Sequence, residues 1–201
     1  MKFGIRTIGA TLACAVLVLT LGAHGVARAQ ASEVCKPEKL SAQKMVDFDT
    51  AFAAANKRAH VWQPDAVVVR LTHTALGPID PDARSASWYM LWFSPSIRKR
   101  IVITVANGVM TCREDANNPG RVPVFKSDVY TDVRQLLITA SEKGGGLLIQ
   151  NGAQPTVELS AGSEIVAFRG IWFVNYRATD GRSLQVTFDG STGKFEKAIR
   201  N

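Results

Sequence analysis

Two serine–lysine pairs come nearest to catalytic chemistry in type and spacing. Ser41 precedes Lys44 by three residues, and Ser96 precedes Lys99 by three. Both match the Ser-x-x-Lys pattern, in which a lysine amine can help to activate a serine hydroxyl as a nucleophile. The pattern is short, and the companion motifs that complete such sites are absent, as are Gly-x-Ser-x-Gly, His-Glu-x-x-His and a phosphate-binding loop. We therefore predict no catalytic serine.

The histidines and one acidic turn are weaker candidates. His60 follows a predicted helix, which favours a surface position, and His73 lies on the apolar side of a predicted strand without a visible nucleophile to assist. Asp80 and Asp82 flank Pro81 in a stretch with turn chemistry, and they lack the further oxygen ligands that calcium needs. We therefore predict no metal site, no cofactor and no enzymatic activity.

An aromatic strand offers the best candidate for a binding surface. Residues 87–94 place one alternating set of side chains, Tyr89, Leu91 and Phe93, opposite a second set led by Trp88. Both faces are apolar, so something must cover both. The face of Tyr89, Leu91 and Phe93 either packs between two units of the chain or anchors a partner protein, for which aromatic residues are favoured.

The first 29 residues have the pattern of an export signal. Lys2 and Arg6 precede an apolar stretch over 8–23, and residues 27–29 form a small-x-small cleavage site. The apolar stretch is shorter than the roughly 20 residues of a membrane-spanning helix. We predict a signal peptide over 1–29, no stable membrane anchor after cleavage, and a periplasmic or secreted protein.

Two cysteines remain after cleavage. In an exported protein Cys35 and Cys112 most simply form one disulfide, with a metal pair or two free thiols as alternatives. Loss of Lys2, Arg6 and Arg28 lowers the formal net charge from +7 to +4. So mild and scattered a charge, in an exported protein, argues against a nucleic-acid partner.

Hydrophobic periodicity predicts helices and antiparallel strands in alternation. We expect one helix over 37–59, and a second that begins at Ser127 or Asp128 and ends at the glycine run 144–146. Alternation and turn chemistry predict strands at these positions: 67–72, 87–94, 100–106, 147–150, 156–168, 172–178 and 184–188.

A faint internal repeat organises these elements. Trp88 recurs as Trp172, 84 positions later, and Asp47 recurs as Asp132, 85 positions later. The repeat predicts an α+β fold of two helix-plus-antiparallel-sheet units in tandem. We expect the first unit over 30–113, a linker over 114–126, and the second unit over 127–201.

The closing hairpin resembles the PepSY family of exported domains. It has a tryptophan-led strand, a polar turn, an alternating strand and an Asp-x-x-Thr-Gly-Lys turn, here Trp172, Tyr176, Gly181, Val186, Phe188, Asp189, Thr192, Gly193 and Lys194. The resemblance is good over about 30 residues and extends more weakly over 127–197. It implies a cystatin-like helix-on-sheet fold and a binding role, often peptidase inhibition or regulation.

Two functions therefore stand as hypotheses. The first is a non-catalytic module of the cell envelope that binds a protein partner, as a peptidase or hydrolase inhibitor or regulator, through Tyr89, Leu91 and Phe93. The second is a protein or enzyme that binds a small hydrophobic ligand in a pocket between helix and sheet. In that case His73, Asp47 or Asp132 would supply the polar groups.

Overall fold

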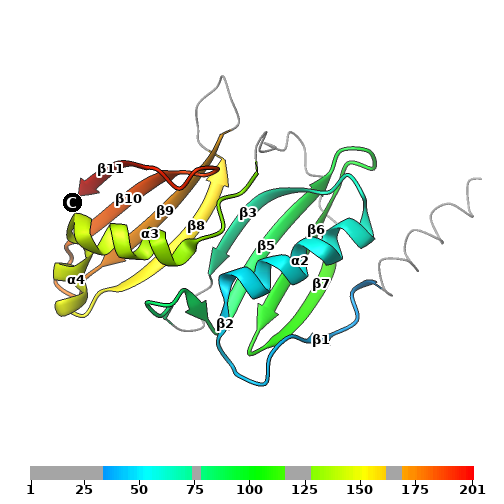
Figure 1. Cartoon of the computed structure of the whole chain (residues 1–201), viewed down its shortest axis with the longest axis horizontal. Coiled ribbons are helices and arrows are strands. Elements are labelled where there is room, and N and C mark those ends of the chain that lie inside the picture. Colours follow the sequence, from blue (N-terminus) through cyan, green and yellow to red (C-terminus); the bar gives the residue numbers. More distant parts are fainter. Residues whose placement is uncertain (1–33, 74–77, 116–127, 162–168) are drawn as a thin grey trace, which may run out of the picture.

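The computed structural model describes residues 34–73, 78–115, 128–161 and 169–201. These residues form one large antiparallel sheet with helices on one face (Figure 1). The nine strands follow the order β1-β7-β6-β5-β3-β8-β9-β10-β11. Their bounds are β1 Glu38–Lys39, β3 Val67–His73, β5 Ser87–Ser94, β6 Lys99–Ala106, β7 Val109–Asp115, β8 Gln154–Ala161, β9 Gly170–Arg177, β10 Ser183–Asp189 and β11 Phe195–Arg200. Two short strands, β2 Val46–Asp47 and β4 Arg84–Ser85, pair separately.

The expectation of two helix-plus-sheet units in tandem is wrong, because the strands belong to one sheet. β3 pairs with β8, so that Leu71 lies opposite Leu159 and Thr72 lies opposite Glu158. Two separate units would each leave an open strand edge at this point. Pairing the edges satisfies their backbone N–H and C=O groups and buries the two leucines.

The predicted boundaries fall mostly outside the described residues. β7 continues to Asp115, two residues into the predicted linker, and the rest of that linker and the predicted signal peptide over 1–29 are not among the residues described. Within the described ranges, no helix is both long and apolar enough to cross a membrane.

The first helix begins later than predicted. α2 spans Phe48–Trp62, and the carboxylate of Asp47 caps it by accepting a hydrogen bond from the backbone N–H of Thr50 at 2.8 Å. The expected start near residue 37 is wrong, since that segment forms β1 and pairs with β7. The helix buries Phe48, Ala51, Ala55, Ala59 and Trp62.

The second helix begins later than the predicted Ser127 or Asp128, and it is broken at the glycine run as predicted. α3 spans Val133–Ala140 and is capped by Asp132, but a distorted turn over Ser141–Gly145 carries the chain into α4, Gly146–Gln150. Gly144 has φ +119°, a non-helical conformation that interrupts the helix at this point, and the chain becomes helical again in α4. The strand expected at 147–150 is therefore wrong.

An aromatic cluster joins the two halves of the sheet. The ring centroid of Phe48 lies 5.1 Å from that of Trp88 and 5.6 Å from that of Trp172. Trp88 Nε1 donates to the carbonyl of Val46 at 2.9 Å, and Trp172 Nε1 donates to the carbonyl of Tyr130 at 3.0 Å. The two donors lie 84 residues apart, as do the two acceptors, so the sequence repeat marks an equivalent hydrogen bond in each half of the sheet.

Two hairpins and the disulfide agree with the sequence. β5 pairs with β6 along its whole length, and β9 pairs with β10, as the alternation predicts. Cys35 and Cys112 are joined in a disulfide, which is confirmed. Because disulfides persist in oxidising compartments, this bond fits an exported protein.

Candidate functional site

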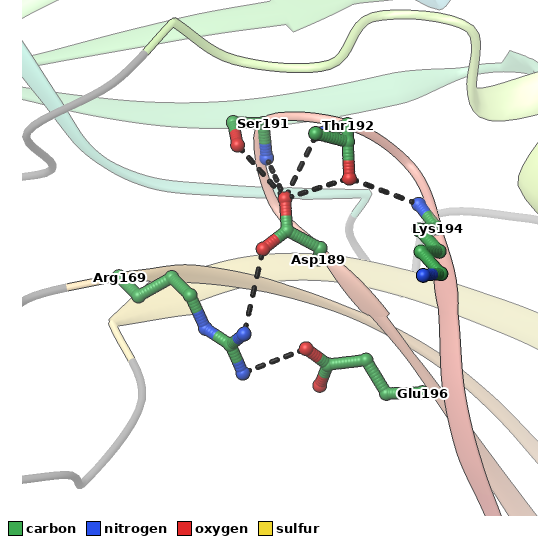
Figure 2. Close-up of polar contacts among 6 residues, drawn as sticks. All are labelled: Arg169, Asp189, Ser191, Thr192, Lys194 and Glu196. Atoms are coloured by element: carbon green, nitrogen blue, oxygen red, sulfur yellow. Dashed lines mark hydrogen bonds and ion pairs between the residues drawn. The ribbon is translucent and has the colours of Figure 1, made fainter.

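The Asp-x-x-Thr-Gly-Lys turn is held by one carboxylate (Figure 2). Asp189 Oδ1 accepts hydrogen bonds from the backbone N–H and the hydroxyl of both Ser191 and Thr192, at 2.8 to 3.1 Å. Burial raises the pKa of Asp189, but these hydrogen bonds outweigh it and lower the pKa to about 2. Arg169 bridges Asp189 Oδ2 at 3.5 Å and Glu196 at 2.6 Å.

The same turn supports the segment that leads into α3. Gly193 has φ +68°, and a Cβ there would lie 2.5 Å from the ring of Tyr130. The backbone N–H of Tyr130 donates to the carbonyl of Gly190 at 2.8 Å. The residues that carry the PepSY resemblance thus close a turn and position a helix, and none of these contacts assigns them a ligand.

The predicted partner-binding residues lie on the sheet face opposite the helices. Tyr89 faces the same side as its register partners Thr72 and Thr104, whereas Trp88 and Met90 point into the core. Tyr89 and Leu91 are half-buried, and Phe93 is 9% exposed. Packing between two separate units does not cover these residues, because the two halves share one sheet.

The charges on this face are mostly positive. Arg70 pairs with Glu158 at 2.8 Å, and Arg100 pairs with Asp115 at 2.6 Å. Three further cations point to the same side by register and form no ion pair with any described residue: Arg113, Arg177 and Lys197. We name Tyr89, Leu91, Phe93, Phe173 and these cations the sheet-face patch.

The three polar residues proposed for a pocket between helix and sheet lie elsewhere. His73 is 6% exposed, its Nδ1 has no hydrogen-bond partner among the described residues, and burial lowers its pKa. Asp47 and Asp132 cap α2 and α3. Burial raises the pKa of Asp49, and the negative charges of Asp47 and Asp132 raise it further, because the starts of the two helices are close together. None of them lines the groove described next.

A groove of about 460 Å³ lies beside the bent helical segment. Its lining comes from the loop over 78–81, from α3, the distorted turn and α4, and from the start of β8. Its lining residues are Pro78, Ile79, Asp80, Pro81, Leu137, Ile138, Ser141, Glu142, Ile149, Ala153, Gln154, Pro155 and Tyr176.

Tyr176 lines the groove, and Gly145 makes room for its ring. A Cβ on Gly145 would lie 2.4 Å from the ring of Tyr176, so the missing side chain is what allows this tyrosine under the bend. Burial raises the pKa of Tyr176 to about 12, and its hydroxyl is therefore neutral. Among the other lining residues, Ile138 is 42% exposed and Ile149 is 46% exposed.

Sequence reasoning missed this groove. The apolar periodicity of the second helix predicts Val133, Leu136 and Leu137 as its buried face, and all three are buried. Ile138 is an apolar residue outside the buried face of this helix, and this is the one local feature of the sequence that could have indicated the groove. Ile79 and Tyr176 join it only through the fold. In the part of the chain that the structure describes, no three His, Cys, Asp or Glu side chains are grouped to hold a metal ion.

Comparison with known proteins gives one distant likeness. No protein-family model and no curated protein matches this chain. The crystal structure of a putative lipoprotein from Clostridium difficile 630 is similar, with a TM-score of 0.48 and 9% sequence identity over 78% of this chain and 93% of that one. No functional conclusion follows from a likeness this weak, and membership of the PepSY family stays a prediction.

Proposed function

We propose that this chain is a periplasmic or secreted binding protein that holds the apolar part of a small molecule in the groove beside α3 and α4. The observation that carries the proposal is the concave apolar surface itself. Its volume of about 460 Å³ falls in the range of small-molecule sites, and such sites pair apolar walls with a few polar groups.

The exposed isoleucines supply a driving force. Ile138 and Ile149 leave nearly half of their surface to solvent, although both sit on walls that face the loop over 78–81. Covering that surface contributes roughly 1 kcal/mol for each side chain, because full burial of an isoleucine contributes about 1.5–3 kcal/mol. A ligand between the walls gains from both at once.

Binding of the neutral dye N-phenyl-1-naphthylamine tests the proposal. We expect saturable fluorescence enhancement with the mature protein, and at least tenfold weaker binding to an Ile138→Gln/Ile149→Gln variant. Leu147→Gln is the matched control, since Leu147 is 66% exposed on the same segment and does not line the groove. Equal binding to all three proteins, or no saturable binding, would contradict the proposal.

A protein partner on the sheet-face patch is a second candidate, favoured by the partly exposed side chains of Tyr89 and Leu91. Arg113, Arg177 and Lys197 form no ion pair with a described residue, so we expect a partner whose contact surface has an apolar centre and acidic surroundings. They also disfavour a second copy of this chain, whose patch would carry the same charges. Inhibition of a peptidase stays a prediction of the family resemblance.

Affinity capture on envelope extracts tests this second candidate. We expect a retained protein to be lost with Tyr89→Ser and with Arg113→Glu, and to be kept by Ile138→Gln. Phe93 is avoided because it is buried and its loss would disturb the fold. Retention that survives both patch substitutions would exclude the patch as the docking surface.

A further inference from the structure

The charged residues of the groove have one sign. Among its lining residues only Asp80 and Glu142 carry charge, and both are carboxylates. The whole chain is basic, with a formal net charge of +7. We call Asp80 and Glu142 the rim carboxylates. Two negative charges at the groove of a basic protein indicate which head group a bound molecule should carry.

Asp80 is fixed by the backbone around it. Its Oδ1 accepts hydrogen bonds from the N–H of Asp82 at 3.0 Å and of Arg84 at 2.8 Å, and its own N–H donates to the carbonyl of Arg84 at 2.9 Å. No described residue donates a hydrogen bond to Oδ2. The backbone thus holds Oδ1 of Asp80 in place, and Oδ2 stays available to a ligand.

Three cations beside the segments that carry these carboxylates have other partners. The guanidinium of Arg84 donates to Gln43 and to the carbonyl of Met45. Arg134 pairs with Asp82 at 3.3 Å, and Asp82 does not line the groove. Lys143, next to Glu142 in the chain, places its Nζ 4.7 Å from the ring centroid of Phe195. No described cation forms an ion pair with either rim carboxylate.

We propose that the groove selects an amphipathic cation, with an alkyl or aryl body between Ile138 and Ile149 and an ammonium group beside Asp80 and Glu142. This inference rests on the proposed function of the same groove. An ammonium group can donate to the open oxygen of Asp80, whereas a carboxylate head would face two like charges. The neutral hydroxyl of Tyr176 adds no charge that would change this preference.

A head-group series with one chain length tests the inference. Decylamine, decanol and decanoate compete with N-phenyl-1-naphthylamine for the full mature protein, below the concentrations at which they form micelles. We expect decylamine to compete at least tenfold better than decanol, and decanoate to compete worst. The advantage of decylamine should shrink as salt is added, because the rim is open to solvent.

Two isosteric variants assign the effect to the rim. Asp80→Asn/Glu142→Gln should remove most of the tenfold advantage of decylamine and leave decanol unchanged, since Asn keeps the oxygen that the backbone holds. Asp128→Asn is the control, because Asp128 is exposed and does not line the groove. It should behave as the wild type.

The outcomes separate the two proposals. If the dye and decanol bind in a manner that depends on Ile138 and Ile149, but decylamine has no advantage, the head-group inference is overturned and the groove function stands. A preference for decanoate, or an advantage of decylamine that survives the rim variant, also overturns it. If no probe binds, both proposals fail.

Discussion

Substitution of Asp189 by Asn should expose how much one turn stabilises the sheet. The pKa of Asp189 falls from 3.8 to about 2 when the chain folds, as the hydrogen bonds of Ser191 and Thr192 overcome the opposing effect of burial. One pKa unit corresponds to about 1.4 kcal/mol, so the full shift corresponds to roughly 2.4 kcal/mol. Solvent reaches this turn and screens the interaction, and we therefore expect Asp189→Asn to lower the free energy of unfolding by about 1–2 kcal/mol at neutral pH.

The pH dependence has a defined direction. Because the pKa of the folded state is lower than that of the unfolded state, the stabilisation is complete above the ordinary value of 3.8 and disappears as the pH falls through about 2. The free energies of unfolding of wild type and Asp189→Asn should therefore differ at neutral pH and converge in acid.

Urea unfolding, followed at neutral pH and in steps toward acid, measures this difference. Asp180→Asn is the matched control, since Asp180 belongs to another polar turn and its side chain is 46% exposed, against 19% for Asp189, and we expect no measurable change. Equal stability of wild type and Asp189→Asn at neutral pH would refute the reasoning. A difference that stays constant with pH would show that the charge of Asp189 is not its cause.

Three further predictions concern the disulfide, the bend and the buried histidine. Replacing Cys35 and Cys112 together by Ser should lower the free energy of unfolding by about 4 kcal/mol in urea, because the bond closes a loop over a sequence separation of 77; an unchanged midpoint would contradict this. Gly145→Ala should lower the free energy of unfolding by about 1–3 kcal/mol, since the added Cβ would lie 2.4 Å from the ring of Tyr176. In Gly146→Ala the Cβ would lie 3.0 Å from the side-chain oxygen and 3.4 Å from the backbone oxygen of Ser141, so the loss of stability should be smaller. Burial lowers the pKa of His73, so its contribution to stability falls as the pH drops below the ordinary histidine pKa of 6.5. The melting temperature should therefore fall with decreasing pH less steeply in His73→Phe than in the wild type. An identical pH dependence in the two proteins would exclude His73 as its source.

The sequence predicted the elements whose signals are local. Strand β5 and its partner β6 follow from the alternation around Trp88 and Ile103, and the final hairpin follows from that around Trp172. The Cys35–Cys112 bond followed from counting cysteines in an exported chain. In each case the evidence lies within a few residues or in composition.

The predictions that were wrong concern helix bounds and strand pairing, which depend on contacts between distant parts of the chain. Asp47 and Pro37 are both acceptable helix starts, and pairing of β1 with β7 selects the later one. The glycine run interrupts the helix as predicted, but the chain then forms α4 where we expected a strand, and the close approach of Tyr176 to Gly145 accompanies this bend. Pairing of β3 with β8 joins strands more than 80 residues apart, and no local sequence pattern predicts it. The groove depends on the same long-range contacts.

The strand order has a consequence for behaviour at high concentration. A sheet of nine strands has two open edges, and a long bare edge can recruit the same edge of another molecule. Here one outermost strand, β1, has only two residues, and the other, β11, exposes Glu196, Lys197 and Arg200. Short length at one end and charge at the other oppose stacking of sheets end to end, so the protein should remain dispersed where an unprotected sheet of this width would form fibres.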